Sequence, residues 1–344
     1  GQEIAVGKGF MGGGVTVDET TGDILAFVEG SHPPAEITVY RRNDGGRSWQ
    51  NDEVELQPDK HGHAASMHMN EHGITLRHGK HKGRLLRATR WYAGKNHRSK
   101  WPEHYTNAIY SDDHGKTWQT SDPFPVNGTG EATLAELSDG RIYYNSRRHW
   151  APDGEDPRRR WTGISDDGGQ TWKDVSICKI LPDGDQARDY GLMAGLVRLP
   201  VKDRDILIFS NIESPDGRRR GTIWGSFDGG KTWPVKRLIE KGSFAYSSLD
   251  AGRHGTPSEG WIYLLYEGGP QGGFVSVEIS SETGLTIGGS RGDERIDISD
   301  MPRFQAPRLQ LAEVLPPVLP DMGILAIATL LVFFGAFVAF LRYD

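Results

Sequence analysis

The sequence predicts an all-β fold, a six-bladed β-propeller of four-stranded antiparallel blades followed by a C-terminal transmembrane helix. Three features of the 344 residues support this prediction. A turn motif recurs four times, short strand-like runs bounded by Gly, Asp or Pro lie around its copies, and a long uncharged stretch lies near the C-terminus. Repeated antiparallel units are typical of propellers, in which radial packing leaves only short exposed strand edges.

The turn motif follows the frame x-x-Asp-x-Gly-x-(Ser/Thr)-Trp and occupies residues 42–49, 111–118, 165–172 and 226–233. Its Asp can accept hydrogen bonds from the amides of its own turn, and its Gly permits a positive φ angle. Its Trp buries a large flat surface beneath the turn. A single Asp-Gly turn is common, but four copies whose aspartates lie 69, 54 and 61 residues apart indicate a repeat architecture.

Strand signals recur along the chain. Each run is short, rich in β-branched or aromatic residues and bounded by turn residues. The clearest runs lie at residues 23–28, 36–40, 141–144, 205–209 and 261–266. No long amphipathic helix precedes the C-terminal stretch. Roughly 300 residues at about 50 to 60 per blade give five or six blades, and six is the number that we predict.

The C-terminal stretch contains twenty residues without a charge, a length that matches the hydrocarbon core of a bilayer. We therefore expect a propeller domain at residues 1–289, a linker at 290–321 and a membrane-spanning helix at 322–341, with the head extracellular or periplasmic. The alternative for this stretch is a buried core helix. No signal peptide is visible, and Gly1 is not an initiator Met, so we expect a processed or truncated chain.

The composition argues against some other classes of protein. The net charge is −6, so nothing indicates a general polyanion binder or a nucleic-acid partner. Cys178 is the only cysteine, which rules out an internal disulfide. The histidines His61, His63 and His68 lack a firm metal-ligand spacing. We predict neither a metal site nor a cofactor.

Four separate segments carry side chains that could do chemistry. Glu131 lies among small residues ahead of a strand, where its carboxylate could project into a central cleft. Arg147 lies at the end of the following strand, where its planar donors could bind a carboxylate. Arg218 begins a run of three arginines, and Tyr246 could act as a nucleophile beside a carboxylate. Each has an ordinary alternative: a surface Glu, an Arg paired with a neighbouring acid, a basic turn or a core Tyr.

Together, in this order and on this repeat, the four segments resemble the sialidase (exo-α-neuraminidase) family, whose Asp boxes are similar to the turn motif. The resemblance implies a propeller glycoside hydrolase in which Tyr246 is the nucleophile and Glu131 is its base. It further implies that Arg147 and Arg218 are two of three arginines that bind the carboxylate of sialic acid. Glu267 is similar to the family's carboxylate that orients the remaining arginine.

The N-terminal third departs from the family pattern. The family carries its first arginine in an Arg-Ile-Pro motif on the first strand and a general-acid Asp in the loop after the next strand, and this sequence has neither. The proton donor is therefore unassigned. Chemistry alone makes His32, Glu36 and His63 candidates for it. Arg87 or Arg90 could supply a replacement cation.

The leading hypothesis is a membrane-anchored, sialidase-like hydrolase that releases a terminal sialic acid or a related acidic sugar with net retention. A second hypothesis is a non-catalytic propeller that binds acidic sugars. A third is an enzyme of the same fold with another acidic glycan substrate or a lyase outcome. The expected partners are a sialylated or other acidic glycan and, through the C-terminal helix, a membrane. A purely structural scaffold would leave the ordered candidate residues without a purpose.

Overall fold

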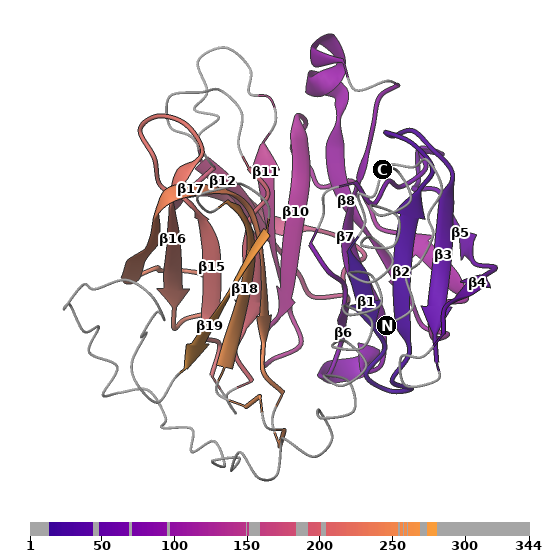
Figure 1. Ribbon diagram of the computed structural model, residues 1–344. Coiled ribbons are helices and arrows are strands. Elements are labelled where there is room, and N and C mark those ends of the chain that lie inside the picture. The colour runs from indigo at the N-terminus through magenta and orange to yellow at the C-terminus, as the bar shows by residue number, and fades with distance from the viewer. Residues whose placement is uncertain are drawn as a thin grey trace, which may run out of the picture.

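The computed structural model describes residues 14–280, apart from 44–47, 69–70, 95–96, 149, 151–158, 184–191, 201–203, 254, 257, 260 and 269–273. These residues form four β-sheets that stand next to one another, from the indigo strands β1–β4 to the orange strands β18 and β19 (Figure 1). The first and last sheets also meet, because Glu19 in the turn after β1 lies 3.9 Å from Arg253, just after β17. The sheets therefore follow one another in a ring.

The sheets and their strands are as follows. The first sheet, in the order β1-β2-β3-β4, contains β1 (Val15–Val17), β2 (Ile24–Glu29), β3 (Ile37–Arg42) and β4 (Gln50–Asp52). The second, in the order β5-β9-β8-β7-β6, contains β5 (Glu55–Leu56), β6 (Ile74–Thr75), β7 (Leu85–Trp91), β8 (Tyr105–Ser111) and β9 (Thr117–Thr120). The third, in the order β10-β11-β12-β13, contains β10 (Thr129–Glu136), β11 (Ile142–Arg148), β12 (Arg159–Ser165) and β13 (Lys173–Pro182).

The fourth sheet, in the order β14-β15-β16-β17-β18-β19, contains β14 (Gly195–Arg198), β15 (Leu207–Ile212), β16 (Arg219–Ser226), β17 (Val235–Ala251), β18 (Trp261–Gly268) and β19 (Phe274–Ser280). Two short 3₁₀ helices, η1 (Gly79–His81) and η2 (Arg98–Glu103), lie in loops of the second sheet. All strand pairs are antiparallel except β5 and β9. The prediction of an all-β fold with antiparallel sheets is confirmed.

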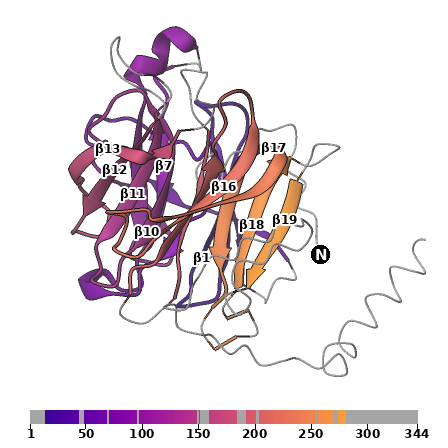
Figure 2. The same cartoon turned by 90° about the vertical axis from the view of Figure 1, so that its left-hand side faces the viewer.

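The prediction of six blades was wrong for the part of the chain that the structure describes, which contains four sheets. The number six came from dividing the chain length by a typical blade size, which assumes a separate sheet for each blade. The 17-residue strand β17 does not fit this assumption. Its first half pairs with β16 and its second half with β18, so two groups of strands join in one six-stranded sheet (Figure 2).

The five predicted strand runs coincide with β2, β3, β11, β15 and β18 to within a few residues at their ends. Such runs form strands because β-branched and aromatic side chains pack well on a pleated, buried surface. No helix within the described ranges is long and apolar enough to cross a membrane. The predicted linker at 290–321 and the predicted span at 322–341 lie outside those ranges.

The turn motif connects neighbouring strands of one sheet, between β8 and β9, between β12 and β13, and between β16 and β17. In the first of these turns, the Ser111 hydroxyl donates to Asp113 Oδ1 at 2.8 Å. Thr117 donates its amide to the same carboxylate at 2.9 Å and its hydroxyl at 2.7 Å. The Asp167 and Asp228 turns repeat all three bonds. The copy at 42–49 lies partly outside the described residues.

The tryptophans of the motif contact the preceding sheet or the segment that follows it. Trp118 of the second sheet has no exposed surface, and its ring centroid lies 5.4 Å from that of Phe27 in the first sheet. Trp172 donates its indole N–H at 2.9 Å to the carbonyl oxygen of Asp122, in the segment that follows the second sheet. Trp233, two residues before β17 of the fourth sheet, packs in one apolar cluster with Tyr143 of the third. The motif is thus an anchor for the ring as well as a turn.

Candidate active site

Strand direction brings the candidate residues to one end of the sheets. Because neighbouring strands are antiparallel, β2, β7 and β11 end, and β10 begins, at the end opposite the turn motifs. We call this end, with Glu29, Trp91, Thr129 and Arg148 at its strand termini, the hub end. The opposite end, which carries the turn motifs, is the box end. Side chains from three sheets can therefore meet at the hub end.

Glu131 of β10, Arg147 of β11 and Tyr246 of β17 do meet there. Arg147 Nη1 donates to Glu131 Oε2 and lies 3.4 Å from the Tyr246 hydroxyl. That hydroxyl lies 3.4 Å from Glu131 Oε1, at the long limit of a hydrogen bond. Glu131 and Arg147 are only 3% and 2% exposed, and Tyr246 is half-buried. Glu131 is thus no surface residue, and it lies within a strand rather than ahead of one.

The charges of this cluster act on one another. The negative charge of Glu131, more than burial, raises the pKa of the Tyr246 phenol. Burial by itself lowers the pKa of Arg147, but the charges of Glu131, Tyr246 and Asp183 and the hydrogen bond to Glu131 together outweigh burial and raise it. The phenol is therefore protonated beside a carboxylate acceptor, and Arg147 is a permanent cation. A phenol in this position can pass its proton to the carboxylate as its oxygen attacks a substrate.

Two further arginines border the cluster. Arg90 of β7 has no exposed surface, and its Nη1 lies 3.8 Å from Glu131 Oε1. Arg218 is exposed, and its guanidinium carbon lies 5.1 Å from the centre of the Tyr246 ring. With Arg147, these side chains place three guanidinium groups around one phenol and one carboxylate. Such a concentration of planar donors suits an anionic ligand.

Arg87 does not join this cluster, although the sequence offered it as an equal alternative to Arg90. Its guanidinium lies over the ring of Phe27, and its Nη1 donates to the carbonyl oxygen of Gly14 at 3.0 Å. Complete burial lowers the pKa of Arg87 to about 10, although the charges of Glu29 and Glu71 oppose this. Of the two, Arg90 is the one that the structure places beside Glu131.

Three other predicted residues lie apart from the cluster. Glu267 is half-buried at the end of β18, and within the described ranges no hydrogen bond or ion pair joins it to Glu131, Arg147 or Tyr246. Glu36 is exposed. His63 Nδ1 lies 2.6 Å from the hydroxyl of a buried tyrosine, and its ring is stacked on a tryptophan at 3.8 Å. The roles inferred for these residues stay predictions.

Sequence reasoning missed a second buried ion pair behind the cluster. Arg160 Nη1 lies 2.9 Å from Asp183 Oδ1, and neither side chain has exposed surface. Asp183 also accepts a hydrogen bond from the Arg148 amide at 2.7 Å. Burial raises the pKa of Asp183 to about 6, against the opposing charges of Arg160 and Arg147. No local sequence pattern distinguishes Arg160 from the two arginines that precede it.

The comparisons with known proteins agree with this geometry. The sequence pattern of the BNR repeat-like domain matches residues 7–257. The chain belongs to the BNR-repeat family of sialidase-like propellers. Within this family, a sialidase of Micromonospora viridifaciens is 34% identical over 289 residues, which cover 78% of this chain and 42% of that protein. An anhydrosialidase of Macrobdella decora is 29% identical over 170 residues, which cover 46% of this chain and 21% of that protein.

A solved structure shows a similar fold. The Hadza microbial sialidase Hz136 superposes with a TM-score of 0.57 at 26% sequence identity, over 74% of this chain and 49% of that one. The present chain therefore spans less than half the length of each of these BNR-repeat relatives. The recognition of the family from its Asp boxes and the four ordered segments is confirmed.

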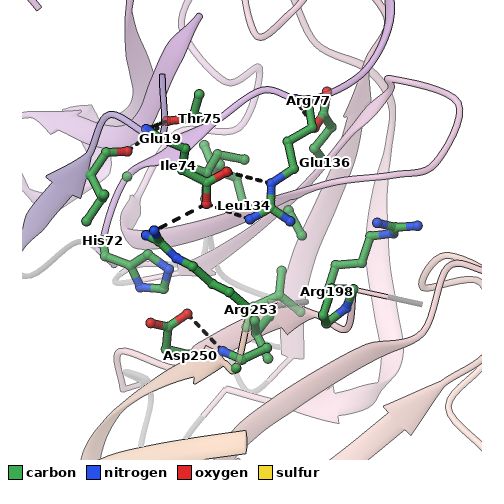
Figure 3. Close-up of a pocket in the computed structure, with 18 of the residues that line it drawn as sticks. Glu19, His72, Ile74, Thr75, Arg77, Leu134, Glu136, Arg198, Asp250 and Arg253 are labelled. Atoms are coloured by element: carbon green, nitrogen blue, oxygen red, sulfur yellow. Dashed lines mark hydrogen bonds and ion pairs between the residues drawn. The ribbon is translucent and has the colours of Figure 1, made fainter. Parts of the chain in front are cut away.

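A polar cavity of about 130 Å³ lies toward the box end of this BNR-repeat propeller. Glu136, at the other end of β10 from Glu131, is one of its lining residues, about 16 Å along the strand. Figure 3 shows the Glu19 carboxylate between two arginines. Glu19 Oε1 lies 2.5 Å from Arg77 Nη2 and 3.9 Å from Arg253 Nη2. Two of the lining arginines thus pair with one lining carboxylate. No group of three or more potential metal ligands lies within the described ranges.

Proposed function

We propose that this protein is a sialidase-like glycoside hydrolase that releases a terminal sialic acid, or a related acidic sugar, from a glycoconjugate. The observation that carries the proposal is the meeting of Tyr246, Glu131 and Arg147 at the hub end, although up to 115 residues of chain separate them. The named sialidases among its relatives support the same reaction class. The substrate is an acidic glycan, because three arginines surround the reacting groups.

The proposed mechanism is a double displacement with net retention. The Tyr246 oxygen attacks the anomeric carbon while Glu131 takes the phenolic proton, and water later releases the sugar from Tyr246. A phenol is a suitable nucleophile here, since it is neutral before attack and does not repel the substrate's carboxylate. The raised pKa of Tyr246 is compatible with this role, because the proton leaves only as the new bond forms.

The arginines fix the orientation of the substrate in this proposal. Arg147 lies beside the Tyr246 hydroxyl and Arg218 lies over the Tyr246 ring. A bidentate contact of these arginines with the sugar carboxylate would hold the anomeric carbon near the phenol. Arg90 takes the place of the missing first arginine, since it lies beside Glu131 from a third sheet. Glu267 is expected to assist only if substrate binding brings it closer.

A second candidate function is the binding of acidic sugars without hydrolysis. It is favoured by the loop between β2 and β3, which has no Asp to act as a general acid. This alternative keeps the arginines as the binding groups and predicts that Arg147→Ala weakens binding of free sialic acid. It also predicts that no glycoside is cleaved under any condition.

Kinetics with a panel of aryl ulosonides, including 4-methylumbelliferyl sialoside, separate the two candidates. We expect turnover by the wild-type protein and a loss of kcat for Tyr246→Phe on the order of 10³-fold or more, as for other enzymes that lose a nucleophile. Binding of free sialic acid, measured by calorimetry, should survive in that variant. NMR of the first-formed sugar anomer reports retention, inversion or a lyase product. Absence of turnover on the whole panel would rule out the hydrolase and favour the binding protein.

A further inference from the structure

The double displacement needs a group that gives a proton to the departing glycosidic oxygen. The inference in this section rests on the proposed hydrolase, since only a glycosidase needs this proton. Glu131 already serves Tyr246, and the loop after β2 has no Asp. The donor must therefore come from other titratable side chains at the hub end.

His32 lies at the hub end, in the loop that joins β2 to β3. Its ring centroid lies 4.9 Å from that of His68 and 5.5 Å from that of Tyr92. Tyr92 in turn lies under the Arg90 guanidinium, whose carbon is 3.9 Å from the ring centre. Arg90 approaches Glu131 at 3.8 Å. A continuous series of contacts thus leads from Glu131 to His32.

We propose that His32 is the general acid and base of this site. Its side chain is half-buried, so it can both contact a substrate and exchange protons with water. Its Nδ1 lies 3.0 Å from the carbonyl oxygen of Pro33, to which it can donate a hydrogen bond in both charge states. Nε2 is then the nitrogen that gains and loses the proton. Imidazole is the side chain best suited to this exchange near neutral pH.

The neighbouring aromatic polar groups cannot take the same role. Burial, together with the charges of Arg90, His32 and Arg147, lowers the pKa of His68 to about 3, so this ring is neutral at working pH. Burial likewise lowers the pKa of His104 to about 3. Both are at most 6% exposed. Neutral rings beside His32 can support its position without competing for the proton.

The carboxylates at the hub end are also poorly placed. Glu29 has no exposed surface and accepts a hydrogen bond from the Met67 amide at 3.2 Å. Glu71 is 2% exposed and binds the hydroxyl of Ser248 and the ring of His72. Neither can reach a departing glycan. Of the groups named here, only His32 both packs against Tyr92, which lies under Arg90, and has access to solvent.

The proton balance of the two steps is as follows. In the first step, the Tyr246 oxygen bonds to the anomeric carbon and its proton passes to Glu131. The glycosidic C–O bond breaks, and the His32 Nε2 proton passes to the departing oxygen, which leaves as an alcohol. In the second step, neutral His32 takes a proton from water as that water attacks the anomeric carbon. Tyr246 departs and recovers its proton from Glu131.

The test compares two substrates of the same sugar with different leaving groups. A 4-methylumbelliferyl sialoside departs as an acidic phenol and needs little protonation, whereas 3′-sialyllactose departs as an alcohol and needs much. For His32→Gln we expect kcat/KM on sialyllactose to fall by about 10² to 10⁴-fold, the usual contribution of a general acid, and on the aryl sialoside by less than about tenfold. His32→Asp, which restores an acid, should recover part of the lost activity on sialyllactose.

Ser31→Ala is the matched control, because Ser31 is exposed on the same loop and has no ionisable side chain; both substrates should react as with the wild type. Equal losses on both substrates in both His32 variants, or no loss on either, would overturn the assignment of His32 while leaving the hydrolase intact. If the wild-type protein cleaves no ulosonide, the proposed function itself has failed. Circular dichroism and thermal melting confirm that each variant is folded, and His32→Asp provides the test if His32→Gln is not.

Discussion

The two ends of the same strands are built in opposite ways. At the box end, three turns repeat one set of hydrogen bonds around Asp113, Asp167 and Asp228. At the hub end, each sheet contributes a different side chain, and Glu131 and Tyr246 come from different sheets. The box end is a repeated structural device, while the hub end is assembled once from unlike parts.

The carboxylates of the two ends differ in electrostatics as well. Burial would raise the pKa of Asp167, but hydrogen bonds from Thr171, Ser165 and nearby amides outweigh burial and lower it. At the hub end, burial outweighs the nearby arginines and hydrogen-bond donors, and it raises the pKa values of Glu29 and Asp183. The turn motifs of the box end therefore stabilise their charges with local donors, although burial raises the pKa of Glu136 at the same end. The hub end holds charges in a buried place where they are costly, which is typical of functional sites.

The largest expected difference between the two ends is in kcat, when each of the two buried glutamates of β10 is substituted. Glu131→Gln removes the proposed base, so kcat on an aryl sialoside should fall by about 10² to 10⁴-fold. The amides of Arg77 and His78 donate to the two carboxylate oxygens of Glu136 at 2.6 and 3.0 Å. Glu136→Gln keeps one of these two acceptors, so it should lower stability but leave the hub end unchanged. We expect this control to retain the wild-type kcat. Similar losses in the two variants would mean that the hub end has no special role.

The difference between the ends explains what could be predicted from the sequence. The hydrogen bonds of each motif's aspartate join residues at most four positions apart, as between Asp113 and Thr117, so a short motif contains the whole turn. The contacts of the hub end span 16 residues from Glu131 to Arg147 and 115 from Glu131 to Tyr246. No spacing rule predicts them, and resemblance to a family was needed to find them.

Where the family pattern was absent, prediction from the sequence failed or stayed open. Arg87 and Arg90 lie on one strand, and only the structure distinguishes the arginine beside Glu131 from the one over Phe27. The Arg160–Asp183 pair joins residues 23 apart without a motif. The blade number failed for a related reason, since nothing in the sequence of β17 shows that it pairs with strands on both sides along its length.

Removal of motif tryptophans should give the next largest effect, on stability rather than activity. Trp118→Ala deletes a side chain with no exposed surface and should lower the free energy of unfolding by about 3 to 5 kcal/mol. Trp172 is half-buried, so Trp172→Ala should cost clearly less. Urea unfolding followed by circular dichroism measures both, with kcat of the folded variants as the control. A large fall in the kcat of either folded variant would contradict the separation of the two ends.

The smallest expected effect is on the pH dependence of stability, and its sign differs between the ends. Asp183 has a folded pKa of about 6 against an ordinary value of 3.8. Between these values the folded protein holds a proton that the unfolded chain has released, so the free energy of unfolding falls as pH rises through this window. Asp167 has a lowered pKa, so its contribution is present above the ordinary value and is lost as pH falls through the folded pKa.

Asp183→Asn should therefore flatten the stability profile between about pH 4 and 6, where an acid with a raised pKa titrates. Asp167→Asn should leave that window unchanged and flatten the profile only below it. Urea unfolding at closely spaced pH values from 3 to 7 gives both profiles, with wild type as the reference. If Asp183→Asn left the slope of the upper window intact, buried charge at the hub end would not be the cause of the difference. The two ends would then differ in sequence pattern alone, and the proposed difference in how they stabilise their carboxylates would be wrong.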